Sequence, residues 1–330
     1  MQARKLFSPG RNSRLQGAPT PIVTMATNLE THHILLITLS NVGDAVMTTP
    51  VIVALRQQYP DASIDIVTDA RASELFEHMP GRGTVYLKDK QAGWRGTVRL
   101  VKNLRRQRYD LVVDLRTDGL TLLLRARTRL TRRGSRTRGH HAVQRHFAVI
   151  AAYEGLRDIP ATTLWLAQSE HNFATSRLSG LPGRHWLAIG PGARWAPKRW
   201  PVEAYRALSE HLQSRFDAVV LLGSQDDAPA CRELATALTL PCLDLAGETT
   251  LLQAAAVLQR MALFIGNDSG LGHLAAARGT PTLTLFGPGD PARYHPWHDR
   301  ARWLQSDSGD IADVTVDAVV TEAARMLENS

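Results

Sequence analysis

The stretch ILLITLSNVGD, residues 34–44, decides the fold of this chain. It is an apolar strand that runs into a turn of small residues carrying an aspartate, and a helical pattern follows it. The stretch FIGNDSGLGH, residues 264–273, repeats this arrangement in the second half of the chain. In open α/β sheets such turns lie at the carboxyl ends of the strands, where ligands bind. The pair predicts two α/β domains that face a central cleft, to which each contributes one carboxylate.

The composition is that of a globular protein with substantial hydrophobic cores. The chain has 330 residues, of which 44% are hydrophobic and 21% charged, enough for two domains of ordinary size. Its two cysteines, Cys231 and Cys242, support neither a disulfide framework nor a zinc site, and we expect two small buried hydrophobes. No apolar run approaches the ~20 residues that cross a bilayer. Residues 1–30 lack the apolar core of a signal peptide, which indicates a disordered basic tail or an upstream start with Met25 as an alternative initiator.

Much of the net charge of +8 lies in one segment. No acidic residue occurs between Asp118 and Glu154, whereas eight arginines do, among them Arg132 and Arg136. Such a block is either a solvated face or a surface for an anionic partner, which is a glycolipid headgroup, a membrane or a nucleic acid. Phe147 is the one Phe, Tyr or Trp in residues 119–150, so the stacking platform of single-strand binders is missing. We expect no nucleic-acid partner.

Strand-like and helix-like patterns alternate along most of the chain, which is typical of parallel sheets. The first half predicts strands at 34–39, 63–68, 84–87 and 110–115 and helices at 44–58, 94–107, 119–130 and 142–154. The second half predicts strands at 186–190, 218–223, 242–245, 262–266 and 281–285 and helices at 201–215, 227–238, 249–259, 269–278 and 313–327. Residues 155–185 hold prolines and glycines without a strong helical period, as in a linker. We therefore divide the chain into an N-terminal domain at 31–170, a linker at 171–185 and a C-terminal domain at 186–330.

Gly43 and Asp44 follow the first strand of the N-terminal half. Glycine permits backbone torsions and close approaches that other residues forbid. An aspartate near a helix N-terminus is either an N-cap, worth ~1 kcal/mol, or a general base that faces the cleft. The hydroxyls of Thr48 and Thr49, which precede Pro50, are likewise either helix surface or ligand contacts. Sequence alone leaves both choices open.

The loop GPGARWAPKRWP, residues 190–201, joins a strand to a helix in the second half. Its glycines let backbone N–H groups approach phosphate oxygens, and Arg194 and Lys198 add positive charge, so it is either an anion site or a basic surface loop. The spacings of a P-loop and of a dinucleotide fingerprint are both absent. Residues 223–227, GSQDD, end another strand. There Gln225 is a candidate for holding ribose hydroxyls, unless the two aspartates only cap the next helix.

Residues 267–273 place a helix N-terminus directly after a strand. Its free N–H groups and the positive end of its dipole favour a diphosphate, with Ser269 and Gly270 as contacts. Asp268 repels a phosphate at close range, so it is a helix cap, a contact of sugar hydroxyls or a group that shares a cation with the phosphate. His273 is more typical of a packed residue than of a catalyst.

In this order, the motifs resemble glycosyltransferase family 9, the ADP-heptose:lipopolysaccharide heptosyltransferases. The resemblance covers about residues 31 to 300. Its pieces are Leu39 to Asp44 with Thr-Thr-Pro at 48–50, the loop at 191–201, Leu-Ala-Gly-x-Thr at 245–249, Asn-Asp-Ser-Gly…His-Leu-Ala-Ala at 267–276 and Leu-Phe-Gly-Pro…Asp-Pro at 285–291. Residues 125–145 depart from the family in being unusually rich in arginine.

The resemblance implies a GT-B fold, with an acceptor bound by the first Rossmann-like domain and an ADP-sugar by the second. It implies inversion at the anomeric carbon by direct displacement. On this basis Asp44 is the general base on the acceptor hydroxyl, Lys198 and the helix at 269–278 neutralise the departing ADP, and Asp268 helps to place the heptose. Asn41, Gly43, Arg132 and Arg136 are the expected acceptor contacts.

The resemblance also implies the substrates and the cellular location. Heptose moves from the co-substrate ADP-heptose to the anionic, lipid-linked inner core of lipopolysaccharide. No cofactor or protein-bound metal is expected to be required, and a divalent cation is an option. The protein would be cytoplasmic, in peripheral contact with the inner membrane. The alternative is a nucleotide-sugar-binding protein that has lost catalysis and acts in envelope assembly.

Overall fold

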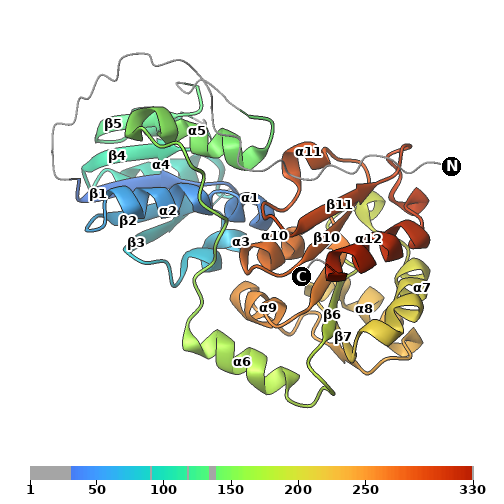
Figure 1. Cartoon of the computed structure of the whole chain (residues 1–330). Coiled ribbons are helices and arrows are strands. Elements are labelled where there is room, and N and C mark those ends of the chain that lie inside the picture. The colour runs from blue at the N-terminus through green and yellow to red at the C-terminus, as the bar shows by residue number, and fades with distance from the viewer. Residues whose placement is uncertain (1–30, 90, 117–118, 134–138, 329–330) are drawn as a thin grey trace.

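The computed structural model describes residues 31–89, 91–116, 119–133 and 139–328, so the tail expected at 1–30 lies outside the described residues. Two parallel sheets form the centres of two α/β domains that lie side by side (Figure 1). The first sheet has the strand order β3-β2-β1-β4-β5 and the second has the order β11-β10-β9-β6-β7-β8. All described pairings are parallel. The expectation of two parallel-sheet α/β domains is confirmed.

The N-terminal domain carries the first sheet. Its strands are β1 (His33–Ile37), β2 (Ser63–Thr68), β3 (Arg82–Leu87), β4 (Tyr109–Asp114) and β5 (Ala126–Thr131). Its α-helices are α1 (Val42–Val46), α2 (Thr49–Gln58), α3 (Ala70–Ser73), α4 (Gly93–Leu104) and α5 (Ala142–Glu154), and its 3₁₀ turns are η1 (Glu74–Phe76) and η2 (Leu120–Leu123).

Both faces of β1 are buried, which explains its unbroken apolar sequence. Because side chains alternate along a strand, Ile34 and Leu36 pack with α2 and α5 on one face. On the other face, Leu35 and Ile37 belong to a smaller core that α4 and η2 close. The helices on this second face therefore cover much less apolar surface than those on the first.

The helix expected at 44–58 is interrupted between α1 and α2. Pro50 has no N–H and cannot continue a helix that starts earlier, so a new helix begins at Thr49. Thr48 Oγ1 donates to the carbonyl of Ala45 at 2.7 Å and Thr49 Oγ1 to that of Val46 at 2.8 Å, which satisfies carbonyls at the break. Both threonines are fully buried. Their hydroxyls are thus neither helix surface nor ligand contacts.

The prediction of a helix at 119–130 is wrong. The short turn η2 occupies its start, and β5 pairs with β4 in parallel over its end. In β5 the exposed Arg127 and Arg129 alternate with Ala126, Thr128 and Leu130, a period of two that suits an edge strand and not a helix. Arg129 closes η2 by donating from Nε to the carbonyl of Thr121 at 3.0 Å and from Nη2 to that of Leu124 at 2.8 Å.

The C-terminal domain carries the second sheet. Its strands are β6 (Trp186–Gly190), β7 (Ala218–Leu221), β8 (Cys242–Asp244), β9 (Leu263–Asn267), β10 (Thr282–Phe286) and β11 (Ala301–Gln305). Its α-helices are α7 (Val202–Leu212), α8 (Ala228–Ala237), α9 (Leu251–Leu258), α10 (Gly270–Ala277), α11 (Pro291–Tyr294) and α12 (Val316–Glu328). Its 3₁₀ turns are η3 (Ala196–Lys198), η4 (Gln213–Arg215), η5 (Gln225–Asp227) and η6 (Ile311–Asp313). The edge strand β11 was not expected from the sequence.

The connection at 155–185 contains a helix that its weak period did not predict. An extended segment leaves α5 and leads to α6 (Gln168–Leu178), which lies against α9 of the C-terminal domain (Figure 1). Within α6, Ala174 and Leu178 are buried, and two inward positions are too few for a clear sequence signal.

Candidate active site

The two strand–turn–helix motifs, residues 34–44 and 264–273, meet at the junction of the domains. A Cβ atom on Gly270 of α10 would lie 3.0 Å from Cγ1 of Val42 in α1. One on Gly43 would lie 2.5 Å from Cδ2 of His273. Figure 1 shows α1 and α10 next to each other between the two sheets. The carboxyl end of β1 thus faces the carboxyl end of β9.

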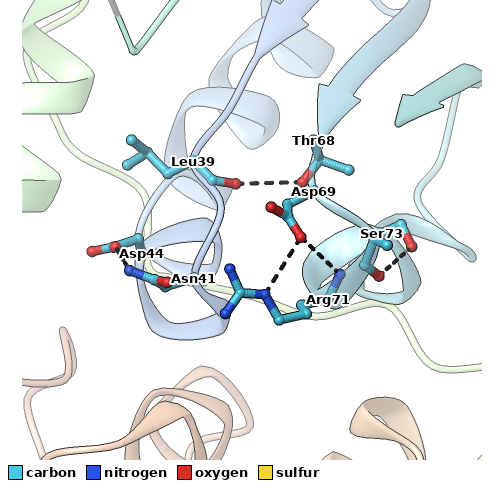
Figure 2. A network of polar contacts seen from close by, with 8 residues as sticks. Leu39, Asn41, Asp44, Thr68, Asp69, Arg71 and Ser73 are labelled. Carbon is cyan, nitrogen blue, oxygen red and sulfur yellow. Dashed lines mark hydrogen bonds and ion pairs between the residues drawn. The ribbon is translucent and has the colours of Figure 1, made fainter. Parts of the chain in front are cut away.

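Asp44 is the third residue of α1 and accepts a hydrogen bond from Asn41 Nδ2 at 2.9 Å (Figure 2). Asn41 occupies the N-cap position, so the N-cap alternative for Asp44 is wrong. The residue before it, Gly43, lies directly against His273 of the other domain, so Asp44 belongs to the part of α1 that meets α10. It is partly exposed at the domain junction. A carboxylate there can accept a proton from a ligand hydroxyl.

Lys198 and Asp268 form an ion pair on the opposite side of the junction. The Lys198 ammonium, at the end of η3, donates to Asp268 Oδ2, directly after β9. Their side chains are 29% and 14% exposed, so the pair is accessible to a ligand. Both groups also act electrostatically on His273. The lysine of the basic loop and the aspartate of the second motif therefore belong to one site.

Asn267 joins the loops on either side of this pair. Its Nδ2 donates to the carbonyl of Pro191 at 2.6 Å, and its Oδ1 accepts from the backbone N–H of Trp200 at 3.0 Å and from Tyr205 Oη at 2.9 Å. Its side chain is fully buried. The sheet order reverses between β6 and β9, the place where open α/β sheets bind ligands. Asn267 holds the loop at 191–200 in position at this point, a role that the sequence did not reveal.

Ser269 and Gly270 lie where a diphosphate contact was expected, at the start of α10. The hydroxyl of Ser269 is buried and has no hydrogen-bond partner among the residues that the structure describes. The same is true of Ser40 Oγ in the loop after β1. Each turn therefore holds a buried hydroxyl without a partner among the described residues.

The remaining donor candidates lie further out. Arg194 is exposed on the loop before η3, and Gln225 is exposed at the carboxyl end of β7. A Cβ atom on Gly247 would lie 2.3 Å from Gln225 Oε1, so the amide rests on that glycine. Asp227 accepts from the backbone N–H of Ser224 at 2.8 Å, which confirms the capping alternative for this aspartate.

Three buried histidines line the junction. His273 is 6% exposed, and burial lowers its pKa to about 4. Burial lowers the pKa of His141 to about 3, with the nearby His295 as a further cause. His141 Nε2 lies 2.8 Å from the carbonyl oxygen of His295 and ties α5 to the segment after α11. His273 is packed, as its sequence context indicated.

A cationic group surrounds the third histidine, His146. Burial, together with the positive charges of Arg132, Arg145 and Arg293, lowers its pKa to about 4. Arg132 follows β5 and Arg145 lies on α5, whereas Arg293 comes from α11 of the other domain. Arg132 is therefore near the junction. Arg136 lies outside the described residues.

Asp69 and Arg71 lie near Asn41, and sequence reasoning missed both. Asp69 Oδ1 accepts from the backbone N–H of Arg71 at 3.3 Å and caps α3. In Figure 2 the guanidinium of Arg71 points toward Asn41. The signal was available, because Asp69 directly follows β2 as polar ligand residues follow the other strands.

Among the described residues, no group of three or more His, Cys, Asp or Glu side chains has the arrangement of a metal site. No helix in the described part of the chain is long and apolar enough to span a membrane. A polar pocket of about 460 Å³ lies around His185, Thr280 and Arg300, near the amino ends of β6 and β10. It is at the opposite edge of the sheet from the motifs.

Comparisons with known proteins agree over most of the chain. The family model described as Glycosyltransferase family 9 (heptosyltransferase) matches residues 97–320. Lipopolysaccharide heptosyltransferase 3 of Escherichia coli (strain K12) is 31% identical over 284 residues, which are 77% of this chain and 82% of that protein. Lipopolysaccharide heptosyltransferase 2 of Salmonella typhimurium (strain LT2) is 29% identical over 317 residues, covering 84% and 88%.

Solved structures agree as well. The E. coli ADP-heptose lps heptosyltransferase II superposes with a TM-score of 0.76 over 90% of this chain and 99% of that one, at 27% identity. A glycosyl transferase family 9 protein from Veillonella parvula, 21% identical, shares the fold with a TM-score of 0.82 over 92% and 99%. These matches confirm the GT-B expectation. By its sequence and its fold, this chain belongs to glycosyltransferase family 9, the heptosyltransferase family, and is a glycosyltransferase.

Proposed function

We propose that this enzyme transfers a heptose from ADP-heptose to the inner core of lipopolysaccharide, with inversion at the anomeric carbon. The observation that carries the proposal is the contact between α1, which carries Asp44, and the start of α10, which follows the Lys198–Asp268 pair. A base therefore faces a site that suits a diphosphate. The relatives named as lipopolysaccharide heptosyltransferases support the choice of sugar and acceptor.

In the proposed reaction, Asp44 takes the proton of the acceptor hydroxyl. The acceptor oxygen attacks the anomeric carbon from the face opposite the diphosphate, the bond from that carbon to the phosphate oxygen breaks, and ADP leaves. Asn41, bonded to Asp44, fixes the direction of the carboxylate. Inversion follows because the nucleophile and the leaving group occupy opposite faces of the sugar.

The departing ADP gains negative charge that needs positive groups in fixed positions. Lys198 and the backbone N–H groups at the start of α10 supply them, and Ser269 Oγ adds a donor. Before the donor binds, Asp268 neutralises Lys198. In the complex, Asp268 contacts heptose hydroxyls instead, and Gln225 contacts the ribose.

The acceptor binds on the N-terminal domain beside Asn41 and Gly43. Arg132 and its neighbours around His146 suit the negative charge of a lipid-linked core oligosaccharide. The enzyme would act at the cytoplasmic face of the inner membrane. Because Lys198 already faces Asp268, the ammonium takes the place of a cation shared with the phosphates, and we propose that a divalent ion is optional.

Two measurements test the proposal. Mass spectrometry of core oligosaccharide from a strain lacking this chain should show the loss of one heptose. Purified enzyme given ADP-heptose and that truncated core should restore it, and NMR of the product should show the anomeric configuration opposite to that of the donor. Retention of configuration contradicts direct displacement, and no transfer favours the binding-protein alternative.

A further inference from the structure

The face of the N-terminal sheet that carries α4 and η2 exposes an unusual number of large apolar side chains. Trp94 and Val98 on α4 are 72% and 56% exposed, and Leu122 and Leu123 on η2 are 80% and 53% exposed. These four are more than half of the seven large apolar side chains that are exposed in the described part of the chain. Single exposed apolar residues need no explanation, but several on one face mark a contact surface.

The two elements that carry these side chains cover the same face of the sheet. Leu100 and Leu104 of α4 and Leu120 and Leu124 beside them pack into the same core, on the same side of the sheet. In both elements, one set of side chains packs against the sheet, and the other set faces outward. We call Trp94, Val98, Leu122 and Leu123 the α4–η2 patch.

Basic residues lie on or next to the elements that carry the patch. The helix α4 carries Arg95, Arg99 and Lys102 and no acidic residue, and Arg125 follows η2. The guanidinium carbon of Arg95 lies 5.7 Å from the ring centroid of Trp94. Apolar and aromatic side chains framed by cations suit an interface in which rings enter the headgroup layer and cations meet anionic lipids.

The position of the patch suits access to the site. The helix α4 follows β3, so its first turn with Trp94 lies toward the carboxyl edge of the parallel sheet. Asn41 and Asp44 lie at that same edge, after β1. A bilayer against the patch would therefore present lipid-linked molecules near the domain junction.

We propose that the α4–η2 patch docks this enzyme on an anionic lipid bilayer. The patch itself is defined by exposure and charge, whereas the choice of a bilayer as partner rests in part on the proposed lipid-linked acceptor. RNA fits less well, because Trp94 is the one aromatic side chain of the patch and single-strand binders stack several bases.

Sedimentation of the full chain with vesicles tests this docking. One set of vesicles contains phosphatidylglycerol in phosphatidylcholine, and the other contains phosphatidylcholine alone. The double variant Trp94→Ser with Leu122→Ser removes apolar contacts, and Arg99→Gln with Arg125→Gln removes two charges. Tyr153→Ser on α5 is the matched control, because Tyr153 is 51% exposed on an element that packs on the other face of the sheet.

The wild-type chain should bind the anionic vesicles, and binding should weaken as salt rises. The apolar variant should lose at least tenfold in binding. The charge variant should lose about 25-fold, because ~1 kcal/mol per cation near an anionic surface corresponds to about fivefold each. Tyr153→Ser should bind like the wild type.

Absence of binding by the wild type overturns the docking proposal, as does equal binding by the apolar variant and the wild type. Preferential, salt-sensitive retention of RNA that the same variants abolish would also overturn it. Heptose transfer to a deacylated, water-soluble acceptor separates this inference from the proposed function. All variants should keep that activity, so its loss in the wild type counts against the reaction and not against the surface.

Discussion

Gly43 of the first domain lies directly against the His273 ring of the second, so close that a Cβ atom on residue 43 would be 2.5 Å from Cδ2 and 2.9 Å from Nε2 of that ring. Both residues sit in helices that start at the carboxyl ends of strands, α1 after β1 and α10 after β9. His273 is buried and cannot swing into solvent. Glycine is therefore required at residue 43 for the domains to meet as they do.

Replacing this glycine should disturb the junction. Gly43→Ala forces the ring or α1 to move, and overpacking of this kind costs ~1–3 kcal/mol. We expect a lower melting temperature and at least a tenfold loss of transfer, because Asp44 is the next residue. Gly180→Ala is the control, since a Cβ there meets no atom within 4 Å. Equal melting temperatures for the two variants would show that His273 does not pack against residue 43 in the folded protein.

The pair of Lys198 and Asp268 predicts opposite effects of two substitutions on ADP binding. Lys198→Ala should weaken ADP at least tenfold, because the diphosphate loses its cation. Asp268→Asn should leave ADP affinity unchanged or increase it, because Lys198 no longer has a competing partner and an anion is gone. Heptose transfer should fall in both variants.

Isothermal titration calorimetry with ADP gives the affinities in this comparison. Arg206→Ala is a suitable control, since it breaks an exposed ion pair with Glu210 on α7, away from the site. Unchanged ADP affinity in Lys198→Ala would place the diphosphate elsewhere.

Asn267 should position the loop that carries Lys198 without touching the substrate. Asn267→Asp keeps the shape but replaces an N–H donor by an oxygen that faces the carbonyl of Pro191 at 2.6 Å. We expect a loss of stability on the order of 2 kcal/mol and a higher KM for the donor. Asn172→Asp on the exposed side of α6 should change neither quantity. A normal KM in a destabilised Asn267→Asp would limit this residue to a structural role.

Acid should destabilise the protein through its buried histidines. Burial lowers the pKa of His273 and of His146 to about 4, whereas an unfolded histidine titrates near 6.5. Between these values the unfolded chain binds more protons, so the free energy of unfolding decreases as pH falls from ~6.5 toward ~4. Each histidine contributes on the order of 3 kcal/mol to that decrease, at ~1.4 kcal/mol per pKa unit.

Urea unfolding at several pH values measures this dependence. His146→Asn removes one of the titrating groups and should flatten the curve, whereas the exposed His140→Asn should leave its slope unchanged. A curve for His146→Asn that parallels the wild type would show that His146 does not stay neutral in the folded protein.

Much of the fold was readable from the sequence because the strands of both sheets are buried on two faces. Their apolar runs stand out, and those at β1, β4 and β9 were placed within a residue or two. The edge strands β5 and β11 were missed for the complementary reason. An edge strand is half exposed, and polar side chains interrupt its apolar pattern.

Site residues could be predicted from the sequence where a charged side chain lies at or near the carboxyl end of a strand. That signal identified Asp44, Lys198 and Asp268, and the structure brings the helix that carries Asp44 against the start of α10, next to the Lys198–Asp268 pair. The contact of Gly43 with His273 and the ties made by Asn267 depend on the docking of two domains and of two loops. No local pattern records such long-range contacts, so only the folded structure reveals them.

The substitution Asp44→Asn tests the central claim most directly. The amide keeps the size of the carboxylate but cannot accept a proton, and loss of a general base typically costs 10²–10⁴ in rate. Because Asp44 lies across the junction from Lys198, ADP should bind with nearly wild-type affinity while kcat for heptose transfer falls by about that factor. A variant that transfers heptose at the wild-type rate, or that loses ADP binding to the same extent as transfer, would contradict the assignment of Asp44 as the base.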